Sequence, residues 1–470
     1  MFELHHLTAL EQLDWLRRGE ISPVELVEHY LGRIEALNPT LGAFTTVTAD
    51  AALARARNLE SALPKAAALW GLPLGDKDLW MRAGVTTMYG SRLMKDFVPE
   101  TSDEIVQVLD SAGGVSLGKT NTPEFGLPAY TESAVAPPAR TPWDLALGAG
   151  GSSGGAAVAV AAGMLPVAPG SDGGGSIRIP AAATGLVGLK PSRGRVPSDS
   201  GFSTLGGLVV AGPIARTVAD AALLLDAIAG PSPWSVGPPS WDGGAYLNAA
   251  TRGEGRFQLA VMTTSPWDDA YEITVSADAA AALATAATEL DALGHGIAEF
   301  ALEPDPTYAP AFRTIWQCGA ASIPAETAGE LELLEPLTRW LVERGRAIGA
   351  RELGAALLQL AQFERSVIRQ FAGFDAVLTP SLAMTPRPLG WYDLADGERN
   401  FAQQVQYTPW TSLANVAGLP AITLPVHQSA DGLPMGVQLI GRPGREDVLL
   451  AIGAQLERRL AWQLRHPPCW

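Results

Sequence analysis

Four serines in one glycine-rich segment have the surroundings that a nucleophile requires. The segment runs from Gly148 to Gly194 and contains two Gly/Ser clusters, which flank a stretch rich in Ala and Val. Glycine lets backbone N–H groups converge on one point, and converging donors suit either a phosphate or a developing oxyanion. Each serine would need a neighbouring base, because a free hydroxyl is a weak nucleophile at neutral pH. The candidate nucleophiles are Ser152, Ser153, Ser171 and Ser176.

Two other interpretations fit this segment less well. A phosphate-binding loop would be expected to contain G-x-x-x-x-G-K-[ST] or G-x-G-x-x-G, but neither pattern occurs here and the flanks are not basic. A flexible linker is the second alternative. Linkers rarely lie inside apolar stretches such as AAVAVAAGM and IPAAATGLVGL. A nucleophile in a loop lined by N–H donors is therefore the leading hypothesis.

A nucleophile elbow offers a rival choice of serine. The run from Gly151 to Gly155 fits G-x-S-x-G, which would make Ser153 the nucleophile. This pattern is short, and Gly/Ser-rich loops match it by chance. A nucleophile elbow also needs a partner histidine. His295, His427 and His466 lie in no recognisable catalytic motif and are interpreted as structural or surface residues.

Lys77 is the candidate base, because it ends the strand-like apolar run GLPLGDKDLW. On an extended backbone neighbouring side chains point away, so Asp76 and Asp78 need not pair with it. A lysine buried in this way can be neutral near pH 7, which requires its pKa to fall by ~3 units, or about 4 kcal/mol. The alternative interpretation is a surface lysine in an acidic loop, and spacing alone favours that alternative.

Alternating helices and strands must position these side chains. Ser22-Pro23 predicts the start of a helix, and Asn38-Pro39 predicts its end. The alternation predicts an α/β fold, with a large mixed β-sheet core covered by helices on both faces. A single domain is expected over residues 1–470, with 231–400 as a more variable part that shapes the substrate site. Further helices are predicted at 51–62, 101–110, 217–228, 276–293, 351–371 and 446–460, and strands at 72–79, 114–119, 257–263, 375–379 and 421–424.

Composition excludes several classes of protein. The 470 residues are 47% hydrophobic and 17% charged, which is enough for a large buried core. A net charge of −16 without a Lys/Arg cluster argues against nucleic acid or an anionic membrane as a partner. Cys318 and Cys469 are too few for a disulfide framework or a metal cluster. No secretory signal or bilayer-spanning run is visible, so a cytoplasmic protein without a metal or other cofactor is expected.

These features together resemble the amidase signature family, whose hallmark is a Gly/Ser-rich segment ending in G-G-S-I-R with a K-D pair upstream. The resemblance extends from the N-terminal helix to the last one. It is carried by Lys77-Asp78, GKTNTPEFG (118–126), GGSSGG (150–155), SDGGGSIRIPAAATGLVGLKPSRGRVP (171–197), NVAGLPAITLP (415–425) and GVQLIG (436–441).

The resemblance implies a role for each matching residue. Ser176 would be the acylated nucleophile, Ser152 the relay serine after a cis peptide bond, and Lys77 the neutral base. The oxyanion hole would consist of N–H groups from Gly173, Gly174, Gly175 and Ser176. Ser153 and Asp172 would hold the loops by hydrogen bonds, and Arg178 would pair with an acidic group behind the site. Tyr130, Gly150 and Gly151 are the candidate substrate-binding residues.

Two positions depart from the family's usual pattern. The residue before the lysine is usually aliphatic, whereas here it is Asp76. A charge beside the base would raise its pKa, unless strand alternation turns Asp76 away. The residue after Asp172 is usually Ile or Thr-like, whereas Gly173 leaves a more pliable loop.

Several substrates and one other enzyme class fit the resemblance. Tyr130, Phe202, Trp316 and Trp410 are candidate pocket walls that favour aryl or alkyl amides, and esters or carbamates present the same carbonyl. The alternative is a glutamine-hydrolysing amidotransferase subunit that acts in a tRNA-dependent assembly. A non-enzymatic binding scaffold is disfavoured because all three reactive positions are intact. The partner is therefore expected to be a small-molecule amide, ester or carbamate, and the family suggests a homodimer.

Overall fold

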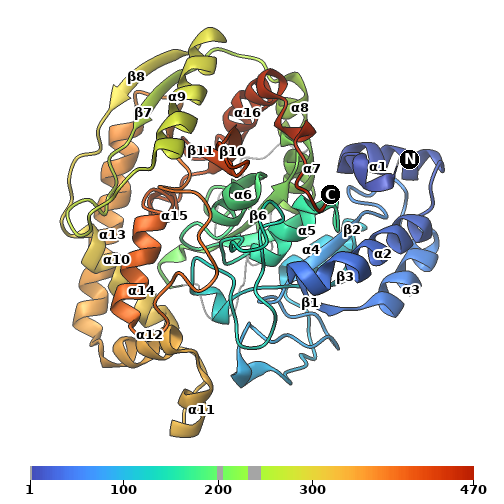
Figure 1. Ribbon diagram of the computed structural model, residues 1–470, viewed down its shortest axis with the longest axis horizontal. Helices are drawn as coiled ribbons and strands as arrows, with labels where there is room; N and C mark the ends of the chain where they lie inside the picture. The colour runs from blue at the N-terminus through green and yellow to red at the C-terminus, as the bar shows by residue number, and fades with distance from the viewer. Residues whose placement is uncertain (1–2, 198–204, 231–244) are drawn as a thin grey trace.

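Two β-sheets organise the chain. The computed structural model describes residues 3–197, 205–230 and 245–470, and Figure 1 shows the N-terminal elements on one side and α10, α12 and α13 on the other. Strands of the large sheet pair antiparallel, except that β7 runs parallel to both β8 and β9. Their order is β4 (Val167–Asp172), β6 (Val210–Ala215), β5 (Val187–Lys190), β10 (Ala421–Gln428), β11 (Pro434–Gly441), β9 (Ala376–Pro380), β7 (Gln258–Met262) and β8 (Gly296–Phe300).

Alternating side chains bury both faces of this sheet. Leu378, Ile422 and Leu439 belong to one apolar cluster, whereas their chain neighbours Val377, Ala421 and Ile440 belong to another. Successive side chains of a strand point to opposite faces, so each cluster covers one face. The cluster with Leu378 also contains residues of helices α7 (Val218–Ile228), α9 (Ala277–Ala292) and α16 (Glu446–Leu460), and α8 (Ala245–Arg252) lies beside α16. The cluster with Val377 contains residues of helices α10 (Tyr308–Ala320), α13 (Ala350–Phe371), α14 (Gly397–Tyr407) and α15 (Thr411–Val416). The predicted helix-covered mixed sheet is confirmed.

The N-terminal elements form a second, smaller sheet that the sequence did not predict. Its strand order is β1 (Phe44–Val47), β3 (Val115–Thr120), β2 (Pro73–Lys77), and β2 also packs beside β4 of the large sheet. The helices around it are α1 (Ala9–Arg18), α2 (Pro23–Leu41), α3 (Ala49–Ala62) and α4 (Glu104–Ser111). Helix α2 starts at Pro23 as predicted, but it continues through Pro39 to Leu41. Gly42, with a φ of 65°, caps its C-terminus. A proline in the last turn removes one hydrogen bond without ending the helix.

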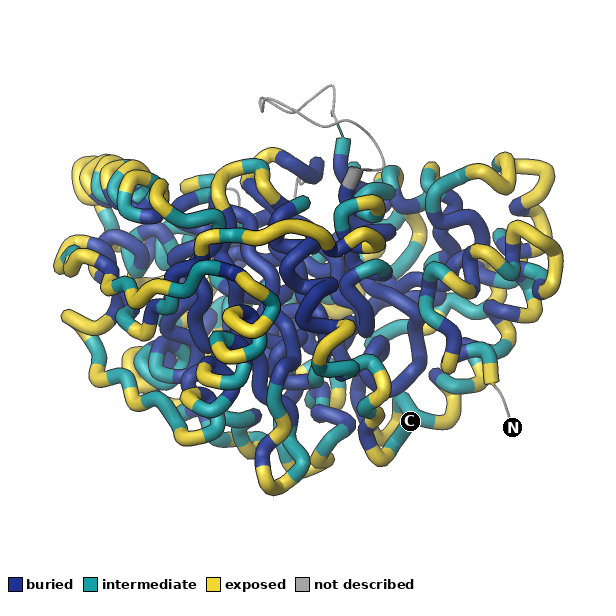
Figure 2. The backbone as a smooth tube through the Cα atoms, turned by 90° about the horizontal axis from the view of Figure 1, so that it is seen from above, coloured by how far each residue is buried: buried dark blue, intermediate teal, exposed yellow. Residues whose placement is uncertain are grey.

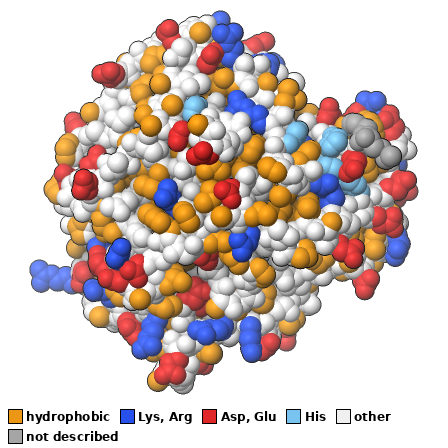
Figure 3. Space-filling model, viewed as in Figure 1, with side chains coloured by type: hydrophobic (Ala, Val, Ile, Leu, Met, Phe, Trp, Pro, Cys, Tyr) orange, Lys and Arg blue, Asp and Glu red, His pale blue; other side chains and the backbone are white. Residues whose placement is uncertain are grey.

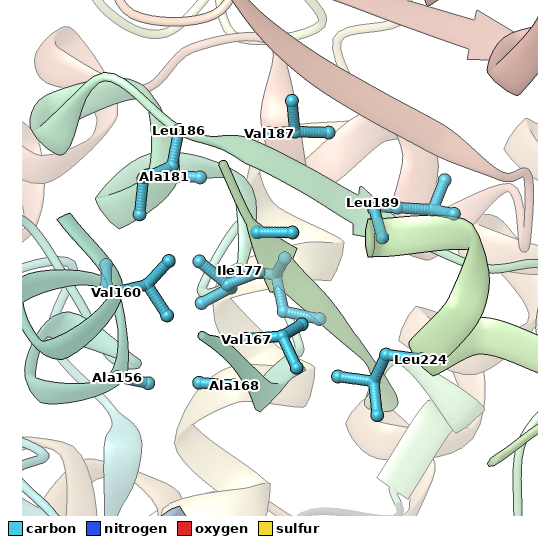
Figure 4. Packing of buried hydrophobic residues seen from close by; sticks show 14 of the residues in the cluster. Ala156, Val160, Val167, Ala168, Ile177, Ala181, Leu186, Val187, Leu189 and Leu224 are labelled. Carbon is cyan, nitrogen blue, oxygen red and sulfur yellow. The ribbon is translucent and has the colours of Figure 1, made fainter. Parts of the chain in front are cut away.

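The glycine-rich segment is part of the core. Its residues form α5 (Gly154–Ala161), β4, α6 (Arg178–Thr184) and β5. Figure 4 shows Val167 and Ile177 between Val160 on one side and Leu189 and Leu224 on the other, all within one buried cluster. A linker is therefore excluded, because the apolar stretches that flank the glycine clusters are buried.

Burial and surface chemistry agree with this architecture. Buried residues fill the middle of the molecule and exposed ones its rim (Figure 2). On the face in Figure 3, Lys and Arg side chains are interspersed with Asp and Glu. Two helices at one end, α11 (Ala328–Leu333) and α12 (Pro336–Ala347), pack near the loops that precede α4 and α5. No helix within the described residues is long and apolar enough to cross a membrane.

Candidate active site

Lys77 is buried at the end of β2, where its amine meets only uncharged oxygens. Its side chain has no exposed surface. The amine nitrogen lies 2.8 Å from the Ser152 hydroxyl, 2.9 Å from the Ser153 hydroxyl and 3.0 Å from the Ser171 hydroxyl. The Ser171 carbonyl oxygen is 3.3 Å away. Strand β2 packs beside β4, which carries Ser171, and beside α5, which directly follows Ser152 and Ser153, so these groups meet from distant parts of the chain.

Burial lowers the pKa of the Lys77 amine from 10.5 to about 7, and the nearby Asp172 carboxylate opposes this shift. A shift of this size corresponds to roughly 5 kcal/mol between the two protonation states. The amine is therefore partly neutral near pH 7. The interpretation of Lys77 as a surface residue in an acidic loop is wrong.

Asp76 points away from the lysine, as strand alternation required. Its carboxylate accepts hydrogen bonds from Arg82, at 2.5 Å, and from the Ser116 hydroxyl, at 2.8 Å. Burial acts to raise the pKa of Asp76, but the charge of Arg82 outweighs burial and lowers it. The Asp76 carboxylate is thus paired with Arg82 on the other side of the strand, and it forms no ion pair with the Lys77 amine.

The Ser152 loop is shaped by two glycines against Tyr130. Gly150 has a φ of 71°, and the Gly151–Ser152 peptide bond is cis, as the resemblance implied. A Cβ at Gly151 would lie 2.6 Å from the Tyr130 carbonyl carbon, so only glycine fits there. The Tyr130 ring is buried, stacks on Tyr392 with 4.1 Å between centroids, and its hydroxyl accepts a hydrogen bond from Asn400 at 2.9 Å.

These contacts give Tyr130 a structural environment. Neither it nor Gly150 or Gly151 lines the two cavities described below. Tyr130 supports the loop that carries Ser152, because its ring is enclosed by Tyr392 and Asn400. The substrate-contact prediction for Tyr130 stays a prediction, which its position outside both cavities does not favour.

The Ser176 loop is organised by the carboxylate of Asp172. This group accepts hydrogen bonds from the N–H groups of Gly175, at 2.8 Å, and Ile177, at 3.1 Å. Arg178 pairs with it at 2.8 Å, and both side chains are fully buried. Burial acts to raise the pKa of Asp172, but the Arg178 charge prevails and lowers it to about 2. A permanent carboxylate therefore holds the loop in shape, as the resemblance implied.

Gly175 is excluded as an oxyanion donor because its N–H donates to Asp172. This corrects the expectation of four donors. The N–H groups of Gly173, Gly174 and Ser176 donate to no other group among the described residues. Gly175 instead serves the turn: its φ is 138°, and a Cβ there would lie 2.6 Å from the Thr411 hydroxyl oxygen.

Two cavities meet at Ser176. The larger, about 770 Å³, is lined by Ser152, Ser171 and Gly173 and by apolar residues such as Leu208 and Ile323. The smaller, about 480 Å³, is lined by Gly174 and by residues that include Phe401, Gln404, Val405, Thr408 and Ser412. Ser176, Leu127 and Trp316 belong to both. No charged side chain of the described residues lines either cavity.

The aromatic residues predicted to line the pocket differ in their positions. Trp316 lines both cavities, whereas Trp410 is fully buried and donates its ring N–H to the Thr263 carbonyl. Phe202 lies outside the described residues. Within the described ranges, no group of three His, Cys, Asp or Glu residues could hold a metal ion.

Comparison with known proteins identifies the fold and the reaction class. The family model named Amidase matches residues 25–450. The chain belongs to the amidase signature family. It is 34% identical over 482 residues to a 6-aminohexanoate-cyclic-dimer hydrolase of Paenarthrobacter ureafaciens, covering 98% of this chain and 96% of that one. Amide hydrolysis is therefore its reaction class.

Solved structures agree with the family assignment. A 6-aminohexanoate cyclic dimer hydrolase complexed with substrate superposes with a TM-score of 0.91 at 32% identity, covering 99% and 100% of the two chains. A bacterial aryl acylamidase of the amidase signature family superposes with a TM-score of 0.85 at 26% identity, covering 98% and 97%. Both cover nearly the whole chain, so the family fold extends over both sheets.

Sequence reasoning missed two residues beside the Ser176 loop. Thr411 and Asn415 of α15 contact this loop although more than two hundred residues separate them from it. Asn415 opens the NVAGLPAITLP motif that resembles the family, but the motif alone gives no indication of its contacts.

Proposed function

We propose that this chain hydrolyses uncharged carboxylic amides through an acyl-enzyme on Ser176, with Ser152 as the proton relay and Lys77 as the neutral base. The observation that carries the proposal is the buried amine of Lys77, 2.8 Å from the Ser152 hydroxyl and with its pKa lowered to about 7. Ser152 and Ser176 line the same cavity, so the relay and the nucleophile face one substrate.

Hydrogen-bond accounting indicates that Ser152 donates to a neutral Lys77. The Ser153 hydroxyl lies 3.2 Å from the Ser171 carbonyl oxygen, to which it can donate, and it accepts from the Ser171 N–H at 3.3 Å. A neutral amine has two N–H donors and one lone pair. Its two protons satisfy the Ser153 and Ser171 oxygens, which leaves the lone pair for the Ser152 hydroxyl.

The reaction follows from this arrangement. Lys77 takes the Ser152 proton while Ser152 takes the Ser176 proton, and the Ser176 oxygen bonds to the amide carbon. The tetrahedral intermediate collapses as Ser152 returns a proton to the departing nitrogen, so a neutral amine leaves. Water then adds to the ester carbonyl by the same proton route, and the acid is released with Ser176 regenerated.

Three N–H groups are available to stabilise the oxyanion of the intermediate. Gly173, Gly174 and Ser176 lie where the two cavities meet, and their N–H groups have no other described acceptor. Loss of one such donor typically costs about 3–4 kcal/mol of transition-state stabilisation. A loop that offers several donors therefore suits amides, whose carbonyl is unreactive.

The two cavities indicate which part of the substrate each one binds. The leaving nitrogen must lie next to Ser152, which protonates it, and Ser152 lines only the larger cavity. The amine part therefore occupies the larger cavity and the acyl part the smaller one. Aryl and alkyl groups suit the mainly apolar walls, and aryl esters or carbamates present the same carbonyl to Ser176.

Glutamine fits this site less well than a neutral amide. Its ammonium and carboxylate would be desolvated without a charged partner among the described lining residues. The glutamine-hydrolysing alternative is disfavoured for that reason.

The test uses the purified chain with N-octylacetamide, N-methylnonanamide and glutamine. We expect both neutral amides to be hydrolysed, with kcat/KM at least about 100-fold above that for ammonia release from glutamine, because leaving a buried charge unpaired costs several kcal/mol. Glutamine hydrolysis at a comparable kcat/KM would contradict the proposed substrate class.

Substitution of Gly319 by leucine tests the assignment of the cavities. Gly319 lines the larger cavity, and a Cβ there would meet no heavy atom within 4 Å, so the side chain can extend without a backbone clash. We expect Gly319→Leu to lower kcat/KM for N-octylacetamide more than about tenfold and for N-methylnonanamide less than about threefold, a difference that filling one apolar pocket can produce. The exposed helical glycine Gly354, which also has open space at Cβ, gives the matched control Gly354→Leu. The reverse order of effects would place the acyl part in the larger cavity.

A further inference from the structure

Three peptide planes between Asp172 and Ser176 have their carbonyl groups held by hydrogen bonds. The Asp172 carbonyl accepts from the Asn415 side-chain amide at 2.9 Å. The Gly174 carbonyl accepts from the Thr411 hydroxyl at 2.6 Å, and the Gly175 carbonyl accepts from the Ile179 N–H at 2.7 Å. Each bond sets the rotation of one peptide plane.

Peptide planarity transmits these contacts to the N–H groups. The carbonyl and the N–H of one trans peptide point in opposite directions. Holding the Asp172 carbonyl therefore directs the Gly173 N–H away from Asn415, and holding the Gly175 carbonyl directs the Ser176 N–H. The Gly174 carbonyl, held by Thr411, turns the Gly175 N–H toward the Asp172 carboxylate, which accepts it at 2.8 Å.

Thr411 and Asn415 come from successive turns of α15, four residues apart, so they lie on one face of the helix. Both are buried, with at most 1% of their surface exposed. Asn415 also donates to the Asp172 carboxylate at 2.8 Å and accepts from Arg178 at 2.6 Å. Arg178 donates to the Thr411 carbonyl at 2.8 Å. The helix and the loop are thus joined through both side chains and through Arg178.

We propose that Thr411 and Asn415 are positioning residues for the oxyanion loop. Asn415 directs the Gly173 N–H, and Thr411 holds the Gly174–Gly175 peptide plane, which lies between the planes that carry the Gly174 and Ser176 N–H groups, so that the three donors converge on the tetrahedral intermediate. The inference rests on the proposed function, because it requires an oxyanion beside Ser176. Neither side chain lines a cavity, so both act through the loop. Thr411 is the more informative of the two, because its hydroxyl lies 2.6 Å from the Gly174 carbonyl and 3.3 Å from its other acceptor, the Thr408 carbonyl of the same segment.

The test compares Thr411→Val with Thr411→Ser. Valine keeps the shape and removes the hydroxyl, whereas serine keeps the hydroxyl. A trifluoromethyl ketone analogue of the substrate serves as the probe, since it forms a tetrahedral adduct with an oxyanion on the nucleophile. Rates are divided by the concentration of active sites that a phosphonofluoridate titrates, so that unfolded protein does not lower the measured kcat.

We expect Thr411→Val to lower kcat about 10- to 100-fold, less than the ~10²–10³-fold typical of deleting an oxyanion donor outright. KM should change less than about twofold, the ketone should bind more weakly by the same factor as kcat falls, and Thr411→Ser should restore both within about threefold. If Thr411→Val does not fold, Thr411→Ala removes the hydroxyl without crowding and carries the same expectation.

The inference is overturned if Thr411→Val keeps kcat and ketone affinity within about twofold of the parent, or if kcat falls without a loss of ketone affinity. Failure of the proposed function is a different result. In that case the parent chain itself would neither hydrolyse neutral amides nor bind the ketone.

Discussion

Ser176→Ala is expected to abolish amide hydrolysis, with kcat reduced by roughly 10⁵-fold or more, as for other serine nucleophiles. The hydroxyl is the only atom group of this side chain that can form the acyl-enzyme, and Ser176 lies where both cavities meet. The measurement is kcat for N-octylacetamide, with folding checked by circular dichroism. KM should change little if substrate binding depends on the cavity walls.

Ser153→Ala separates this account from the nucleophile-elbow alternative. The Ser153 hydroxyl is fully buried, contacts Lys77 and the Ser171 backbone, and lines neither cavity. Its loss should lower kcat about fivefold through the hydrogen bonds of Lys77, since one neutral hydrogen bond contributes about 1 kcal/mol. Near-normal turnover by Ser176→Ala, with loss of turnover in Ser153→Ala, would establish the elbow.

Lys77→Met is expected to reduce kcat at least about 10⁴-fold, because catalytic units of this kind lose most of their activity with any member. Methionine has a similar length and no basic group, so it fits the buried space without a charge. The Ser152 hydroxyl then has no acceptor for its proton. The measurement is kcat for the same amide, and Ser116→Ala, beside Asp76 on the other side of the sheet, provides a matched control.

The pH dependence of the parent enzyme follows from the same lysine. Only the neutral amine can accept a proton, and burial lowers its pKa to about 7. The neutral fraction rises with pH, so kcat/KM should increase through about pH 7 and level off above it. A lysine with an ordinary pKa near 10.4 would be neutral in roughly one molecule in 2,500 at pH 7, and the rate would keep rising to pH 10. That continued rise would show that burial does not lower the pKa of the base to about 7.

The local backbone of the candidate site was easier to predict from the sequence than the contacts of its side chains. The strand at 72–79 predicts the extended backbone that turns Asp76 away from Lys77, and the structure confirms this with the Arg82 pair. Local alternation is enough for that prediction, because neighbouring side chains of a strand point in opposite directions. The glycines at 150–155 and 173–175 likewise mark the loops by their conformational freedom.

Contacts between distant segments required the structure. Gly175 was expected to offer its N–H to the oxyanion, but Asp172, three residues earlier, accepts that bond. Tyr130 was expected to touch substrate, but Tyr392 and Asn400 enclose it. The small β1-β3-β2 sheet was missed for the same reason, because its pairing depends on residues far apart in the chain.

In the proposed mechanism, catalysis depends most on a neutral Lys77 that withdraws the Ser176 proton through Ser152. The most direct measurement is peptide mass spectrometry of the protein after reaction with a phosphonofluoridate, with the labelling rate followed against pH. We expect a single adduct on Ser176, a rate that rises through about pH 7 in the parent, and little labelling of Lys77→Met. An adduct on Ser153 or another residue, or labelling of Lys77→Met at the parent rate, would contradict the account.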